Sequence, residues 1–262
     1  MKEYIEYIFL AIIQGVTEFL PVSSSGHIEF MKHLMGNAAI QKEGAFITVI
    51  LHLATALSII FVFREKLNKL LFKNNLESKN YIINIIVSLI PVAILVLFKI
   101  DQIIEQKYNQ GWDLIFIAVM FLITGLVLFV TEKIKIKTKK ITLMAALIIG
   151  LIQAIAILPG ISRSGATICC ALLLGATKKE ASTFSFLICL PIILGKSIKD
   201  LSSLQLVEFN LIPIIIAFIV AFFIGLLCCK WMIQIVDQSK LKYFGIYCFF
   251  ISTSAFLFHL LS

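Results

Sequence analysis

One short stretch of the chain places a permanent cation among hydroxyl groups and helix-breaking residues. It runs from 158 to 167 with the sequence LPGISRSGAT, and its centre is Arg163, between two serines. An arginine within an apolar helical region costs about 2.5–3.5 kcal/mol on insertion scales, so this guanidinium needs an anionic partner. Its planar fork suits phosphate or carboxylate, and Pro159 and Gly160 free backbone N–H groups that can bind an anion. The two interpretations are an anion site and a structural ion pair between helices.

A second polar cluster lies near the start of the chain, around another predicted helix break at Pro21. Gln14 and Glu18 are four residues apart and therefore share one face of a helix. A carboxylate in an apolar helix is a functional candidate by default. The break that follows carries three serines and a histidine: Ser23, Ser24, Ser25 and His27. Ser24 and His27 have the spacing of a nucleophile and its proton acceptor, although N-capping of a second helix explains at least one of the serines.

The two breaks carry complementary chemistry. Gln153 precedes the second break much as Gln14 precedes the first, and Ser164 and Thr167 lie one helical turn apart after it. The combined set of groups suits an anionic, phosphate-like ligand. The predicted catalytic residues are Glu18, Ser24, His27 and Arg163, and the predicted substrate-binding residues are Gln14, Ser23, Ser25, Gln153, Ser162, Ser164 and Thr167.

The composition places the chain among polytopic α-helical membrane proteins. Of its 262 residues, 60% are hydrophobic and only 15% are charged, and the mean hydropathy is +1.01. We expect a single integral membrane domain over residues 1–262. The net charge of +8 does not indicate nucleic-acid binding, because basic residues of membrane proteins gather in cytoplasmic loops. The six cysteines lie in apolar runs without metal-ligand spacing, so they are predicted to be packing residues.

The apolar segments follow the order broken pair, three spans, broken pair, three spans. The broken pairs cover 4–36 and 141–177, and the expected spans are 45–63, 81–98, 112–131, 181–196, 209–229 and 243–261. The halves of each pair are too short to cross a bilayer, which favours re-entrant helix–break–helix segments. Three crossings per half then make repeat two (about 136–262) inverted relative to repeat one (about 1–135). His52, in the first full span, is interpreted as a helix-packing residue.

Loop charges predict the orientation. The loops on one face carry fifteen basic residues and those on the other carry seven. The positive-inside rule places the more basic face in the cytoplasm, so both termini are expected outside.

At these residues the chain resembles the bacterial undecaprenyl-diphosphate phosphatases of the bacitracin-resistance type. The resemblance lies in Gln14-x-x-x-Glu18, in PVSSSGH at 21–27 and in PGISRSGAT at 159–167, and it extends to FSFL at 184–187. It covers the length of the chain, including the spacing of the two motifs. The family pattern allows Glu or Gln at the first position, which here is Gln14.

The resemblance implies an enzyme of the bacterial plasma membrane that removes the terminal phosphate of a C55 isoprenyl diphosphate. The monophosphate carrier would return to peptidoglycan synthesis, which links the enzyme to cell-wall biogenesis, cell shape and bacitracin resistance. The resemblance also implies that the enzyme needs a divalent cation and that its site opens to the outer face. We expect Mg²⁺ or Ca²⁺ on Glu18, attack by Ser24, proton transfer to His27 and charge stabilisation by Arg163. Direct attack by water remains an alternative.

A second hypothesis comes from a different class of protein. Inverted repeats with broken helices are also a transporter architecture, so the chain could carry or flip an anionic lipid or a small anion. In either case the partners are a polyprenyl diphosphate or another anion and the lipid bilayer, with no nucleic acid. Homo-oligomerisation is left open. Phosphate release from an isoprenyl diphosphate in detergent would distinguish the enzyme from the carrier.

Overall fold

The computed structural model of the chain describes residues 2–35, 44–73, 75–109, 114–131, 140–203 and 211–261, which are mostly helical. The helices follow one another as α1 (Lys2–Thr17), α2 (Ser24–Met35), α3 (Gly44–Val62), α4 (Arg64–Phe72), α5 (Leu76–Leu97), α6 (Ile100–Asn109), α7 (Leu114–Thr131), α8 (Leu143–Ile155), α9 (Arg163–Leu173), α10 (Lys178–Ser203), α11 (Leu211–Asp237) and α12 (Lys242–Leu261).

Helix length and composition confirm a multi-pass membrane protein. Among the described residues, α5, α7, α10, α11 and α12 are long and apolar enough to cross a bilayer. A sixth span results if α3 and α4, which are bent by 73° at their junction, are counted together. The apolar helices α1, α8 and α9 are shorter and belong to the two broken pairs.

Two short helices, α4 and α6, were not predicted. Both are rich in charged and polar residues, so a search for long apolar runs passes over them. An ion pair between Asp101 and Lys199, 2.7 Å apart, joins α6 to α10. The basic stretch 132–139, which contributes to the predicted orientation, lies outside the described residues.

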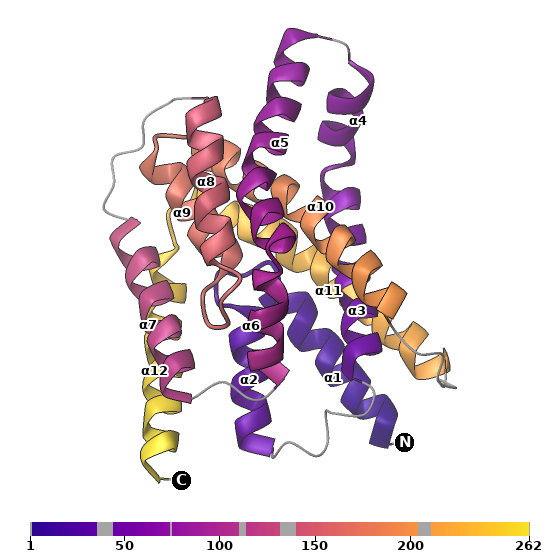
Figure 1. The fold of residues 1–262 in the computed structure, drawn as a ribbon, viewed down its shortest axis with the longest axis vertical. Helices are drawn as coiled ribbons and strands as arrows, with labels where there is room; N and C mark the ends of the chain where they lie inside the picture. The colour runs from indigo at the N-terminus through magenta and orange to yellow at the C-terminus, as the bar shows by residue number, and fades with distance from the viewer. Residues whose placement is uncertain are drawn as a thin grey trace.

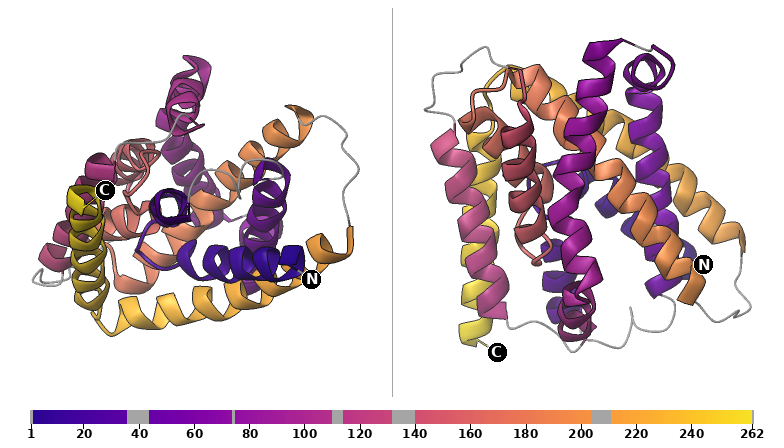
Figure 2. Two further views of the ribbon diagram at one scale, coloured as in Figure 1. Left: turned by 90° about the horizontal axis from the view of Figure 1, so that it is seen from below. Right: turned by 45° about the horizontal axis from the view of Figure 1, so that its top comes forward.

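The two broken pairs come from opposite ends of the molecule and meet near its middle. In Figure 1, α1 and α2 occupy the lower half, whereas α8 and α9 occupy the upper half. The long helices surround them: α1 packs on α11, α8 packs on α5, and α9 packs on α7 and α10. The views of Figure 2 show α11 and α12 along the outside of this arrangement. The start of α1 and the end of α12 lie at the same end of the molecule (Figure 1).

The main hydrophobic core surrounds the point where the broken pairs meet. Phe19 of the first break is fully buried, and its ring centroid lies 5.8 Å from that of Phe186 on α10. Ile168 and Cys169 of α9 belong to the same cluster. All six cysteines are buried and free of disulfides, which confirms their prediction as packing residues.

A close backbone contact joins α5 to α8. A Cβ atom added at Gly150 would lie 2.3 Å from the carbonyl oxygen of Ser88. Small residues allow such approaches between membrane helices. We expect Gly150→Ala to force α8 away from α5 and to destabilise the protein by about 1–3 kcal/mol, which a lower unfolding temperature in detergent would reveal.

The matched control for this prediction is Gly195→Ala on α10. A Cβ atom added there would meet nothing within 4 Å, so the same substitution should leave the unfolding temperature unchanged or raise it. Equal unfolding temperatures for the two variants would contradict the packing argument.

Candidate active site

The first break, residues 18–23, ends in a tight turn that is capped by a serine. Ser23 has a φ of 66°, a left-handed conformation that is uncommon for a residue other than glycine. Its Oγ accepts a hydrogen bond from the backbone N–H of Gly26 at 3.2 Å. This bond satisfies one free donor of the first turn of α2, so the predicted capping role falls to Ser23.

The second break, residues 156–162, repeats this local design. Gly160 has a φ of 95°, and Ser162 is the N-cap of α9. The Oγ of Ser162 accepts a hydrogen bond from the N–H of Gly165 at 3.1 Å. In both breaks, therefore, a serine caps the following helix through the N–H of a glycine three residues later.

The two breaks contact each other directly, as the sequence predicted. The N–H of Gly160 donates to the Oγ of Ser23 at 3.1 Å, and the Oγ of Ser164 donates to the carbonyl of Leu20 at 3.2 Å. A Cβ atom added at Gly26 would lie only 2.8 Å from the Cα of Gly160. The small side chains of both motifs thus permit backbone contact between the halves of the chain.

Thr124 on α7 holds the second break in place, and sequence analysis missed it. Its hydroxyl donates to the carbonyl of Gly160 at 2.9 Å and accepts from the N–H of Ser162 at 3.1 Å. One buried side chain therefore satisfies two backbone groups of an irregular segment. The available signal was a lone hydroxyl in the middle of an apolar span.

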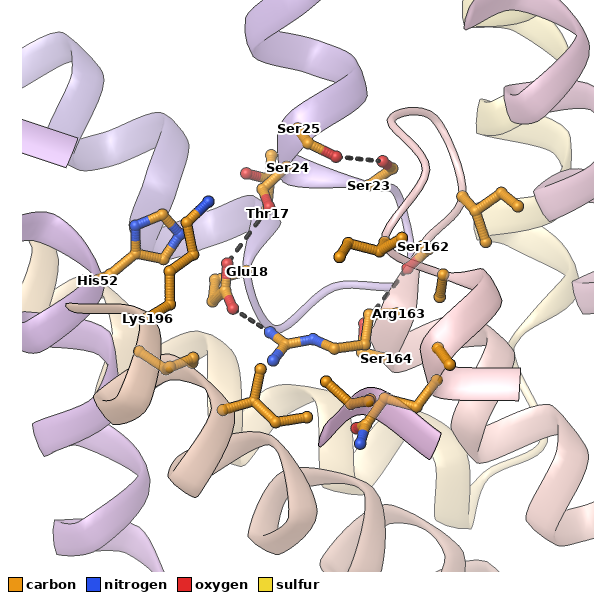
Figure 3. Close-up of a pocket in the computed structure, with 18 of the residues that line it drawn as sticks. Thr17, Glu18, Ser23, Ser24, Ser25, His52, Ser162, Arg163, Ser164 and Lys196 are labelled. Atoms are coloured by element: carbon orange, nitrogen blue, oxygen red, sulfur yellow. Dashed lines mark hydrogen bonds and ion pairs between the residues drawn. The ribbon is translucent and has the colours of Figure 1, made fainter. Parts of the chain in front are cut away.

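An ion pair between Glu18 and Arg163 joins the charged groups of the two breaks (Figure 3). Glu18 is only 7% exposed, and its second carboxylate oxygen accepts from the amide of Gln14 at 3.0 Å and from the Oγ of Ser24 at 3.2 Å. These three partners offset the cost of burying the carboxylate, because removing an ion from water costs several kcal/mol. Arg163 thus forms the structural ion pair that one interpretation predicts. It also faces a cavity, as expected if it belongs to an anion-binding site.

A cavity of about 200 Å³ lies between the breaks and helices α3, α5 and α10. Figure 3 shows polar side chains of both breaks around it. Eight of the predicted site residues line this cavity: Glu18, Ser23, Ser24, Ser25, Gln153, Ser162, Arg163 and Ser164. Its size suits a polar headgroup rather than a whole lipid, because pockets for drug-sized ligands are usually about 300–1,000 Å³.

Three predicted residues do not line the cavity: Gln14, His27 and Thr167. Gln14 lies behind Glu18 and orients its carboxylate through the amide hydrogen bond. Thr167 is buried, and its hydroxyl shares a 2.6 Å hydrogen bond with Ser185 on α10. Both residues support the residues that line the cavity.

His27 packs on α12 instead of contacting Ser24. Its Nδ1 lies 2.7 Å from the carbonyl of Ser23, which can only accept, so Nδ1 carries a proton. The neutral ring then accepts at Nε2 from the hydroxyl of Tyr247, 2.8 Å away, and the two rings stack at 5.7 Å. Both nitrogens are therefore engaged outside the cavity.

His52 and Lys196 line the cavity although sequence analysis did not place them in the site. The Nδ1 of His52 lies 2.8 Å from the carbonyl of Thr48, as expected for a packing residue, but its ring also borders the cavity. Lys196 follows the apolar part of α10, where a lysine normally marks the end of a span. Neither position carries a local motif that distinguishes it from an ordinary polar residue.

The donor set around the cavity fits a divalent cation that is held together with a phosphate ligand. In the part of the chain that the structure describes, no three His, Cys, Asp or Glu side chains gather as a preformed metal cage. Mg²⁺, however, is commonly held by one or two carboxylates plus substrate phosphates. Glu18 supplies a carboxylate, and the buried amide oxygen of Gln153 has no hydrogen-bond partner among the described residues. An unsatisfied buried oxygen on the cavity wall is a suitable further ligand.

Comparisons with known proteins match nearly the whole chain to one family. A protein-family model described as bacitracin resistance protein BacA matches residues 7–254. A protein of Christiangramia forsetii named undecaprenyl-diphosphatase is 45% identical over 258 residues, which cover 96% of each chain. Proteins with the same name from Bacteroides fragilis and Thermosipho africanus are 39% and 40% identical, over at least 94% of each chain.

The two hydrogen bonds of Thr124 generate a prediction for the site. Thr124→Val keeps the shape but leaves the carbonyl of Gly160 and the N–H of Ser162 without their partner. We expect a loss of about 1–3 kcal/mol in unfolding free energy and a lower rate of phosphate release, because the second break is no longer held. Thr124→Ser, which keeps the hydroxyl, should retain both properties. If the valine variant matches the serine variant in both measurements, Thr124 does not support the site.

Proposed function

The chain belongs to the BacA family of bacitracin resistance proteins, and from this premise we propose that it hydrolyses undecaprenyl diphosphate to undecaprenyl phosphate and inorganic phosphate. The observation that carries the proposal is the arrangement of Ser24, Glu18 and Arg163 around one headgroup-sized cavity. The reaction returns the lipid carrier to peptidoglycan synthesis and gives resistance to bacitracin.

The diphosphate occupies the cavity, and the prenyl chain leaves it along the apolar part of the wall. Apolar side chains of α5 and α10, among them Val92, Leu95 and Ile192, form part of the cavity wall and can receive the first prenyl units. The hydroxyls of Ser23, Ser25 and Ser162 also line the cavity and supply hydrogen bonds to phosphate oxygens. The hydroxyl of Ser164 does so when it turns away from the carbonyl of Leu20.

Ser24 is the proposed nucleophile. Its Oγ attacks the terminal phosphorus, the bond from that phosphorus to the bridging oxygen breaks, and prenyl monophosphate leaves. Water then hydrolyses the phosphoserine and releases inorganic phosphate. Arg163 offsets charge on the transferring phosphoryl group, since its guanidinium has five N–H donors and the ion pair with Glu18 does not use them all. Direct attack by water, with Ser24 only binding phosphate, is the alternative course.

Two groups are candidates to accept the serine proton. The carboxylate of Glu18 already receives the Ser24 hydroxyl at 3.2 Å. His27 is a proton carrier near neutral pH, but its ring must first leave either Ser23 or Tyr247 to reach Ser24.

A divalent cation, Mg²⁺ or Ca²⁺, completes the proposed site. Glu18 and Gln153 would hold it together with phosphate oxygens. When bound, such an ion neutralises charge on the diphosphate and polarises its phosphoryl oxygens.

The matching breaks also support an inverted repeat, with halves of about 1–135 and 136–262. The equivalent serine caps at Ser23 and Ser162 and the entry of the broken pairs from opposite ends favour this relationship (Figure 1). The loop charges favour an orientation with both termini outside. Membership of the family favours the bacterial plasma membrane and a site that opens to the outer face.

The first prediction of the proposal concerns Ser24 and Arg163. Phosphate release from an isoprenyl diphosphate in detergent, where no gradient exists, should fall at least about 100-fold in Arg163→Ala, because charge stabilisation in the transition state is lost. Ser24→Ala should lose a similar factor if the serine is the nucleophile, and less if water attacks directly. Binding of the lipid by wild-type protein without phosphate release would instead identify a carrier.

A second prediction separates the two proton acceptors. If His27 accepts the proton, His27→Gln should lower kcat by about 100-fold or more with little change in KM. Tyr247→Phe removes only the partner of Nε2 and should keep kcat within a few-fold of wild type. Similar small losses in both variants, with lower unfolding temperatures, would show that the histidine is a structural clamp and would leave Glu18 as the acceptor.

A further inference from the structure

A second cationic group faces the cavity from the side of Glu18 that is remote from Arg163. Figure 3 shows His52 of α3 and Lys196 of α10 together on this side, with the carboxylate of Glu18 between them and Arg163. Both residues line the cavity.

The carboxylate of Glu18 does not account for these two residues. Arg163, Gln14 and Ser24 already donate to its oxygens. The other carboxylate on the cavity wall is Asp200, one helical turn beyond Lys196 on α10. That spacing lets Asp200 hold Lys196 while no ligand is bound. Glu18 and Arg163 neutralise each other, and a diphosphate carries more negative charge than one divalent cation offsets, so a further cationic side chain would stabilise the bound ligand.

The cavity-facing side of α10 changes from apolar to cationic in one turn. Ile192 and Lys196 are four residues apart and both line the cavity, as do Ile193 and Ser197 one position further along. On α5, Val92 and Leu95 extend the apolar part of the wall. An amphiphile whose charged group is bonded to a hydrocarbon chain matches this sequence of surfaces.

We propose that Lys196, assisted by His52, forms the subsite for the phosphate that is bonded to the prenyl chain. This inference rests on the proposed function and divides the diphosphate between two groups of residues. Ser24 and Arg163 hold the terminal phosphate, which is transferred. Lys196 holds the inner phosphate, which remains on the lipid product. The Nδ1 hydrogen of His52 is taken by the carbonyl of Thr48, so His52 donates to this phosphate from Nε2 in its imidazolium form. Ile192 contacts the start of the hydrocarbon chain.

The test is direct binding of farnesyl phosphate, a short isoprenyl monophosphate, to the full-length protein in detergent. Lys196→Met removes the charge but keeps the length of the side chain. It should weaken farnesyl phosphate binding about tenfold, the effect of one charge-assisted hydrogen bond at an exposed position. His52→Gln should weaken it about two- to fivefold. Inhibition of turnover by inorganic phosphate should remain unchanged in both variants, because that ion occupies the terminal subsite.

Lys199→Met is the matched control. Lys199 lies on the same helix and carries the same charge, but it pairs with Asp101 and does not line the cavity. It should bind farnesyl phosphate as wild type does.

Three results would overturn the inference. They are unchanged farnesyl phosphate binding in folded Lys196→Met protein, an equal loss of inorganic phosphate inhibition, and an equal effect of Lys199→Met. The proposed function fails separately, if wild-type protein releases no phosphate from farnesyl diphosphate, since the binding measurement requires no turnover.

Discussion

The structure depends on a carboxylate and a guanidinium that neutralise each other inside an apolar protein. Either charge alone would destabilise the fold at such a position, because the loss of hydration costs more than scattered hydrogen bonds return. Each lies on a different half of the chain. Their attraction therefore ties the first broken pair to the second, at the point where α1 ends beside Glu18 and α9 begins at Arg163.

Stopping a helix in a membrane exposes backbone groups, and the protein satisfies them from nearby side chains. Ser23 and Ser162 cap the helices that follow, and Thr124 takes up a carbonyl and an N–H of the second break. Irregular backbone is tolerated at this depth only where protein or a polar cavity surrounds it. The two capping serines, unlike Thr124, also line the cavity, so the same two hydroxyls support the breaks and border the proposed phosphate site.

Sequence reasoning succeeded where residue type alone determines behaviour. Pro21, Pro159 and Gly160 had to interrupt apolar helices, and an arginine beside them had to find an anion, so the meeting of the two breaks could be predicted. Residues whose role depends on which helices become neighbours could not be predicted from the sequence. Thr124, His52 and Lys196 come from α7, α3 and α10, and nothing in their local sequence shows that α7 contacts the second break or that α3 and α10 border the cavity. His27 illustrates the converse, because its spacing from Ser24 fits a catalytic pair, yet its ring turns to Tyr247.

The contact of Gly26 with Gly160 has an evolutionary consequence. If the two halves arose by duplication, the backbone of each half now limits which residues the other can carry. The backbone at Gly160 fills the space that a side chain at position 26 would need. Even an alanine at position 26 would clash with the backbone of the other half. The halves are therefore free to diverge in their long outer helices, while their central turns are bound to change together or not at all.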